Sequence, residues 1–204
     1  LGCGALVDLS RCGLPKEPTV QDSLAAGADI ALFSGDKLIG GPQSGIIVGR
    51  KDLVQKIRKH PLARALRVGK LTIAAMEATL KLFLNPETLW DKNPTLHMLS
   101  LKLDSLRPRA EALAEALQPL IECEVMESTS ACGGGALPNS GLPAAVVALK
   151  HKSLTADQLA RHLRLGHPSV AGRIQDDRLL LDTRTLLEGD NERILQAVGA
   201  LPGF

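Results

Sequence analysis

The sequence has 204 residues, a formal net charge of +2 and 45% apolar residues, enough to bury a sizeable core in one large or two small domains. Aromatic residues make up only 2%, so neither a base-stacking surface nor a strongly basic nucleic-acid face is indicated. With no apolar run of about 18 residues and no signal-peptide layout, we expect no membrane span. The four cysteines form no CxxC pair, which favours reduced thiols in a cytoplasmic protein.

The first part of the chain predicts a helix, two strands and a lysine between them. Residues 19–26 predict a short helix, and the apolar run at 29–34 predicts a strand. The β-branched run at 45–50 predicts a second strand. The glycine-rich stretch "SGDKLIGGPQSG" therefore places Lys37 in a loop from one strand to the next.

Helices follow this loop. We expect one at 52–57, a short segment from Pro61 that carries Arg64 and Arg67, and a long one at 72–84 that ends before Pro86. The long helix has four apolar residues at helical spacing, which predicts that they are core positions: Ile73, Met76, Leu80 and Leu84.

Turn formers and helix breakers become dense at 85–94, which predicts a domain junction there and domains at 1–90 and 91–204. A helix is expected at 94–117, with Pro108 kinking or splitting it. Short strands and two further helices follow, which predict a compact α+β unit. The expected strands are 120–127, 144–150, 169–174 and 178–183, and the expected helices are 155–164 and 192–201.

Three interpretations of Lys37 follow from its loop. A P-loop requires a lysine after the second glycine, whereas Lys37 precedes Gly40 and Gly41, so that interpretation is discarded. A solvated turn, in which the glycines permit positive φ, fits the local sequence. A lysine that binds a carbonyl cofactor also fits, because a strand that leads directly into the loop supplies a rigid mount. The local sequence leaves these last two open.

Longer stretches carry a resemblance. The run "SGDKLIGGPQSGIIVGRKDLVQKIRKHPLARALRVGK", with "HPSVAGRIQDDRLLLDTRT" downstream, closely resembles the bacterial selenocysteine synthases, the L-seryl-tRNA(Sec) selenium transferases. The resemblance covers nearly the whole chain. It implies an α/β protein of PLP-dependent transferase fold type I, the aspartate-aminotransferase type, with a partial large domain and a smaller α+β C-terminal domain.

The resemblance also implies an activity and site residues. In this family a pyridoxal phosphate enzyme converts seryl-tRNA(Sec) to selenocysteyl-tRNA(Sec) with selenophosphate, through a dehydroalanyl intermediate. By analogy Lys37 forms the internal aldimine with pyridoxal phosphate and shuttles the Cα proton. Asp36 either caps the loop or orients the amine or the substrate. The family places Arg64 and Arg67 at the selenium-donor pocket, whereas their spacing by itself favours a solvated basic face.

Other residues carry less specific expectations. Arg173 is expected to pair with Asp176 or Asp182, and His167 is expected to be a turn residue. The glycines at 133–135 fit either a linker or a close-approach loop. Cys3 stands where the family pattern has a serine.

The resemblance further implies homodimers assembled into larger rings. The family's cofactor-binding aspartate, phosphate cup and main tRNA-binding domain are expected upstream of Leu1, so this chain is expected to be an incomplete fragment, inactive in isolation, with an uncovered apolar face. Two alternatives stay open: a related PLP-dependent lyase acting on a small amino acid or amino sugar, and a non-catalytic dimerisation fragment.

Overall fold

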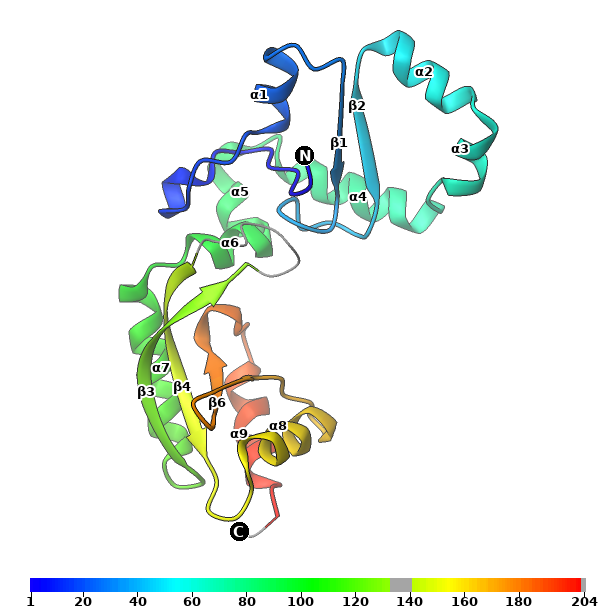
Figure 1. The fold of residues 1–204 in the computed structure, drawn as a ribbon. Coiled ribbons are helices and arrows are strands. Elements are labelled where there is room, and N and C mark those ends of the chain that lie inside the picture. Colours follow the sequence, from blue (N-terminus) through cyan, green and yellow to red (C-terminus); the bar gives the residue numbers. More distant parts are fainter. Residues whose placement is uncertain (133–140, 203–204) are drawn as a thin grey trace. The chain divides into compact units, whose positions relative to one another are not determined.

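The computed structural model describes residues 1–132 and 141–202 and divides them into two compact units (Figure 1). Unit 1 consists of residues 1–100 with 131–132, and unit 2 of residues 101–130 with 141–202. Both units combine helices with strands, which confirms the expected α/β class. None of the described helices has the length and apolar character needed to cross a bilayer. The glycines at 133–135 lie outside the described residues.

Unit 1 contains a two-stranded antiparallel sheet with short helices around it. Strand β1 (Ile30–Ser34) pairs with β2 (Gly45–Gly49), with Phe33 opposite Ile46, which confirms the two expected strands. The helices of this unit are η1 (Leu9–Cys12), α1 (Val20–Ala25), α2 (Lys51–Lys59), α3 (Pro61–Leu66), α4 (Lys70–Leu82), α5 (Pro86–Lys92) and α6 (Pro94–Ser100).

One face of this sheet holds the core of unit 1. Strand residues alternate between the two faces, so Ala31 and Phe33 lie together and are buried, at 5% and 7% exposure. Val20 of α1 completes this cluster from the sequence before the sheet, and Met76 and Leu80 of α4 pack against it. The loop after β1 is therefore attached to a strand that the core holds in place.

The opposite face of the sheet is uncovered among the described residues. Leu32 and Ile47 are 57% and 37% exposed, and they help to line an apolar recess of about 800 Å³ together with α2, α3 and the start of α4. The expectation of an uncovered apolar face is confirmed. The expectation that Ile73, Met76, Leu80 and Leu84 are all core positions is wrong. Ile73 is exposed on α4, and Leu84 is exposed beyond the end of that helix. Helical periodicity shows which side of a helix is apolar, but not whether an element covers it.

Unit 2 is a four-stranded sheet with helices packed on one face. The sheet order is β3–β4–β6–β5, and β6 pairs antiparallel with both β4 and β5. Its core lies between one face of β4 and β6 and the helices, and it includes Leu113, Val147, Leu159, Leu179 and Val198. The elements are α7 (Leu103–Leu117), β3 (Glu122–Ala131), β4 (Gly141–Lys150), α8 (Ala156–Leu165), β5 (Arg173–Gln175), β6 (Arg178–Asp182), η2 (Thr183–Thr185) and α9 (Asp190–Gly199).

The helix expected at 94–117 is two helices. The break lies between Ser100, the end of α6, and Leu103, the start of α7, and Pro108 lies inside α7. Pro108 is exposed, so water can solvate the backbone carbonyl that the missing N–H leaves without a helical partner. The interruption lies at Lys102, whose backbone is extended, with φ −91° and ψ 157°. Lys102 is the N-cap of α7.

A buried arginine stabilises one end of unit 2. Arg184 is 4% exposed, and its guanidinium donates to the carbonyl oxygens of Leu101 and Pro143, each at 2.7 Å, and to Ser130 Oγ at 3.3 Å. Asp182 accepts from Ser130 Oγ at 2.5 Å and from the Arg184 backbone N–H at 3.0 Å. A buried charge is tolerated when its hydrogen bonds are satisfied in this way.

Asp182 belongs to this network, and no hydrogen bond or ion pair joins it to Arg173 in the described part of the chain. The Arg173 guanidinium donates instead to Ser128 Oγ at 2.6 Å, and at 3.5 Å to Gln175. The expected pairing of Arg173 with Asp176 or Asp182 is therefore wrong. His167 lies in the connection from α8 to β5 and is joined to Pro168 by a cis peptide bond.

Candidate functional site

The loop that carries Lys37 connects β1 to β2 and is closed by its own backbone. The Gly35 N–H donates to the Ser44 carbonyl, and the Gly41 N–H donates to the Gly35 carbonyl, both at 2.9 Å. Inside this ring the Gly40 N–H donates to the Lys37 carbonyl, also at 2.9 Å. The base of the loop and the lysine's own peptide are thereby fixed together.

The two residues that directly follow Lys37 attach the loop to the rest of unit 1. Leu38 and Ile39 are 4% and 0% exposed, and the Leu38 N–H donates to the Cys3 carbonyl at 3.4 Å. The Ile39 carbonyl accepts a hydrogen bond at 2.9 Å from the side-chain amide of Asn93. Lys37 itself is half-buried. The structure thus presents a partly accessible amine on a loop whose neighbouring residues are immobilised by burial.

Asp36 precedes Lys37 and faces solvent. Its side chain is exposed and accepts no hydrogen bond from residues 1–132 or 141–202. The loop-capping role considered for Asp36 is therefore absent from the described part of the chain, and its other role, orienting the amine or the substrate, stays a prediction.

Glycines let the loop pack closely against two helices. A Cβ on Gly35 would lie 2.2 Å from Met76 Cε of α4, and a Cβ on Gly40 would lie 2.6 Å from Thr95 Oγ1 of α6. Gly40 also has φ +73°, in the left-handed region. The loop can therefore reach this position only with glycine at both places.

We expect Gly40→Ala to destabilise unit 1 more than Gly13→Ala does. Gly13 has a similar φ of +77°, but a Cβ at that position would meet nothing within 4 Å, so its substitution isolates the backbone strain of about 1–2 kcal/mol. The clash with Thr95 should add about 1–3 kcal/mol for Gly40→Ala. The measurement is urea unfolding followed by fluorescence of Trp90, the single tryptophan, which lies in unit 1. Equal losses in the two variants would contradict the close packing of the loop.

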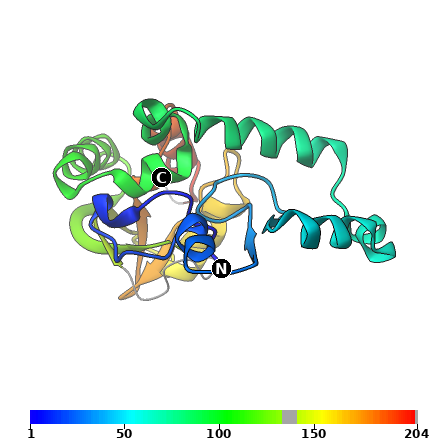
Figure 2. The same ribbon diagram turned by 90° about the horizontal axis from the view of Figure 1, so that it is seen from above.

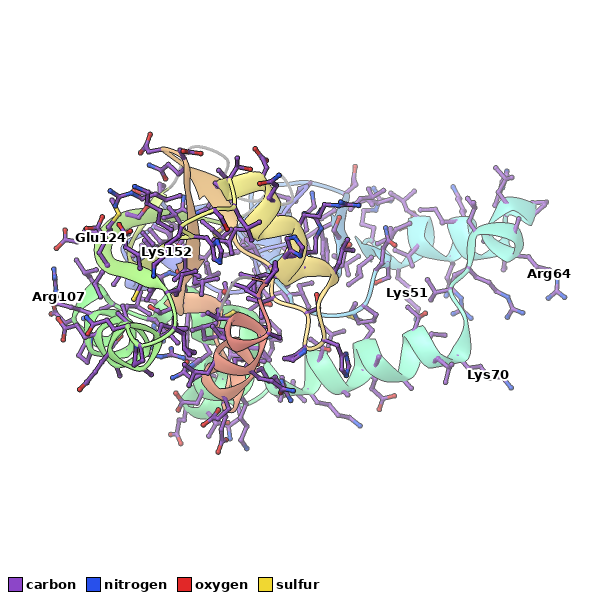
Figure 3. The ribbon with its side chains drawn as sticks, turned by 90° about the horizontal axis from the view of Figure 1, so that it is seen from below. Lys51, Arg64, Lys70, Arg107, Glu124 and Lys152 are labelled. Atoms are coloured by element: carbon purple, nitrogen blue, oxygen red, sulfur yellow. The ribbon has the colours of Figure 1, made fainter. Side chains whose placement is uncertain are left out.

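Arg64 and Arg67 lie on an arm formed by α2, α3 and the connection to α4. Arg64 is on α3, and Arg67 follows its end with an extended backbone, so the two are not on one continuous helical segment as expected. Both are exposed, and neither forms an ion pair with any described residue. Every charged residue from 53 to 76 is basic. Figure 3 shows Arg64 and Lys70 extending outward from the ribbon.

The root of the arm is held by an ionic cluster. The Arg50 guanidinium contacts Asp29, before β1, at 3.0 Å, and Asp52, in α2, at 2.9 Å. Hydrogen bonding to Arg50 lowers the pKa of Asp52 from its usual value. All three side chains are more than half exposed, so solvent screens both ion pairs. Together they join the start of α2 to the residue before β1.

This chain does not bring the arginines and the lysine together. Figures 1 and 2 both place α3 at the outer end of the arm, away from the connection between β1 and β2 that carries Lys37.

Asn93 was missed by sequence reasoning, because its contact with the loop joins residues 54 positions apart and leaves no local signal.

Comparisons with known proteins identify the family to which this sequence is similar. The family model described as "SelA: L-seryl-tRNA selenium transferase" matches residues 1–187, which confirms the resemblance inferred from the motifs. An L-seryl-tRNA(Sec) selenium transferase of Alkaliphilus metalliredigens is 46% identical over 201 residues, which cover 97% of this chain and 43% of the relative. The protein of that name from Moorella thermoacetica is also 46% identical, over 100% of this chain and 44% of the relative. The chain thus spans less than half the length of these curated relatives.

Solved structures give weaker matches. An alanine–glyoxylate aminotransferase from Nostoc sp. aligns with 13% identity and a TM-score of 0.36, over 87% of this chain and 49% of that structure. An ornithine δ-aminotransferase of Plasmodium falciparum aligns with 14% identity and a TM-score of 0.33, over 94% and 43%. Scores at this level leave the assignment to the sequence match.

Proposed function

The chain belongs to the L-seryl-tRNA selenium transferase family, and we propose that it is the lysine-bearing part of an enzyme that converts seryl-tRNA(Sec) to selenocysteyl-tRNA(Sec). In this proposal selenophosphate donates selenium, pyridoxal phosphate is the cofactor, and the fold is the PLP-dependent fold type I. The proposed domain junction near residue 90 precedes the division between the two compact units, at residues 100 and 101. The reaction takes place in the cytoplasm, where aminoacyl-tRNA is used. Because the chain covers 43–44% of its relatives, the activity is that of the whole protein.

The observation that supports this proposal most directly is the position of Lys37. The family match includes a lysine whose loop is closed by three backbone hydrogen bonds and packed through buried neighbours. A lysine that binds a carbonyl cofactor needs such a rigid mount together with access to the cofactor, and Lys37 is half-buried. The residues present therefore fit the attachment point of pyridoxal phosphate.

Each proposed site residue has a defined task. Pyridoxal phosphate, when bound, supplies a conjugated ring that accepts electrons from the substrate Cα. Lys37 would hold the cofactor through Nζ and would take and return the proton on the substrate Cα. Asp36 orients the Lys37 amine from the adjacent position in the chain. Over the whole reaction the seryl Cβ–O bond and the Se–P bond of selenophosphate break and a Cβ–Se bond forms. Phosphate is released, and the water lost from serine balances the water that hydrolyses the Se–P bond.

Arg64 and Arg67 bind the selenium donor in this proposal. Guanidinium groups suit a phosphate-like anion because they offer paired donors and keep their charge at neutral pH. Both side chains are exposed and have no ionic partner among the described residues, so they are available for such an anion. The absence of acidic residues from 53 to 76 further favours anion binding.

The arm also supports a homo-oligomer. Because α3 extends away from the loop of Lys37, we propose that the arginines of one copy act beside the lysine of a second copy. The exposed apolar residues of the arm, such as Leu62 and Leu66 at 58% and 77%, give that contact an apolar component. A closed dimer in which both sites form this way is the simplest symmetric assembly.

The test is chemical labelling of the completed enzyme, meaning this chain extended to the length of its relatives. Sodium borohydride reduction of the pyridoxal-phosphate-loaded protein, followed by peptide mapping, is expected to find the pyridoxyl group on Lys37. The control is Lys51→Ala, which removes the nearest lysine after the loop and should leave the labelling unchanged. A label on Lys51 or Lys70 would refute the assignment.

A further inference from the structure

Asn93 is a fully buried polar residue between α5 and α6. Its exposure is 0%, and both its backbone and its side chain are hydrogen-bonded. Its N–H donates to Leu89 at 2.9 Å, and its carbonyl accepts from His97 at 2.8 Å. Its Oδ1 accepts from the Leu96 N–H at 3.1 Å, which caps the first turn of α6. The remaining group, the side-chain NH2, donates to the Ile39 carbonyl in the lysine loop at 2.9 Å.

The cap does not require an amide. An N-cap needs only an oxygen acceptor, so aspartate or serine would serve α6 about as well as asparagine. Asn85 shows the simpler case, because it caps α5 by accepting from the Glu87 N–H at 3.2 Å and is exposed. The NH2 group of Asn93 therefore has a separate role, which is its bond to Ile39.

That bond reaches the loop two residues after Lys37. Ile39 is buried, so its carbonyl oxygen would be left without a partner if the amide were removed. Thr95 lies against Gly40 on the same side, where its hydroxyl would be only 2.6 Å from a Cβ added to that glycine. The start of α6 thus contacts the loop at two consecutive residues and sets its distance from the helix.

We propose that Asn93 is a positioning residue for Lys37: its side-chain amide holds the Ile39 carbonyl and thereby fixes where the lysine amine is delivered. This inference rests on the proposed cofactor role of Lys37. The hydrogen bond to Ile39 keeps the loop in one position, and the cap of α6 keeps Asn93 in place. Loss of the amide frees the loop without unfolding the helix.

The test compares Asn93→Asp with Asn85→Asp in the completed enzyme. Asn93→Asp keeps the size of the side chain and its capping oxygen, but places an oxygen where the amide donated to Ile39. Asn93→Ser is the second variant, since it keeps the cap with a smaller side chain and adds no charge. Hydrogen exchange of peptides covering residues 35–44, measured without cofactor, is expected to be about tenfold faster in both Asn93 variants and unchanged in Asn85→Asp.

The second readout is specific to positioning. With pyridoxal phosphate bound, the pH titration of its visible absorbance is expected to shift in the Asn93 variants, and kcat is expected to fall about tenfold with little change in KM for seryl-tRNA. Unchanged exchange of the loop in both variants would overturn the inference. The inference would also be overturned if the Asn93 variants showed faster exchange of the loop but had the same absorbance titration and the same kcat as Asn85→Asp. Asn93 would then be merely structural. If Lys37→Ala retains cofactor covalently, the proposed function fails, while the exchange comparison still decides whether Asn93 holds the loop.

Discussion

Replacing Lys37 by alanine in the completed enzyme is expected to abolish covalent attachment of pyridoxal phosphate and to lower the rate of selenocysteyl-tRNA formation at least about a thousandfold. Proton transfer by a positioned side chain contributes roughly 10²–10⁴ in rate, and Lys37 is proposed to combine this with holding the cofactor. The measurements are the visible absorbance of the protein after gel filtration and the conversion of seryl-tRNA with selenophosphate.

Two comparisons make this result specific. Lys51→Ala removes an exposed lysine at the start of α2 and should retain cofactor and activity. Added methylamine should restore part of the activity of Lys37→Ala, because a small amine can carry the Cα proton in place of the missing side chain. Activity in Lys37→Ala equal to that of Lys51→Ala would return Lys37 to the interpretation as a solvated turn residue.

The second large effect concerns the arginines and depends on mixing subunits. Arg64→Ala and Arg67→Ala are each expected to lower kcat/KM for selenophosphate roughly tenfold to a hundredfold, because a hydrogen bond to a charged group contributes about 1.5–3 kcal/mol. Arg58→Ala removes a cation from the same arm and should have a much smaller effect. The double variant Arg64→Ala/Arg67→Ala should be nearly as inactive as Lys37→Ala.

Mixed dimers of the Arg64→Ala/Arg67→Ala enzyme and the Lys37→Ala enzyme are expected to be active. If each site uses the lysine of one copy and the arginines of the other, random exchange restores one intact site in half of the dimers, or about a quarter of all sites. Activity is measured before and after subunit exchange, with each variant also exchanged against itself. No recovery in the mixture, with exchange verified by mass, would show that a single copy supplies both groups.

Local sequence predicted the strands of unit 1 well, for a physical reason. β1 and β2 are short apolar runs bounded by glycine and polar residues, and they pair directly through the loop between them. The signals for Lys37 as a candidate were also local, since a strand leads into a glycine-rich loop. The chemical role assigned to it came from the family resemblance.

The errors arose where distant contacts decide. Pro108 has the strongest local signal for a break, yet α7 continues through it on an exposed side, and the break falls at Lys102, which carries no such signal. Arg173 lies near two aspartates in sequence, but its guanidinium donates to Ser128 Oγ, 45 positions earlier in the chain. Such pairings depend on how strands are brought together, which short-range patterns do not encode.

The two separate cores have a thermodynamic consequence. The core cluster around the sheet of unit 1 contains residues of unit 1 alone, and the main core cluster of unit 2 contains residues of unit 2 alone, so each unit has a core of its own to lose on unfolding. Tryptophan emission reports on unit 1, which contains Trp90. The β-sheet contribution to the far-ultraviolet circular dichroism comes mainly from unit 2, which contains the long strands β3 and β4. Melting curves recorded by these two probes therefore report on different cores, and a change in stability on mutation is assigned to the unit whose probe it shifts.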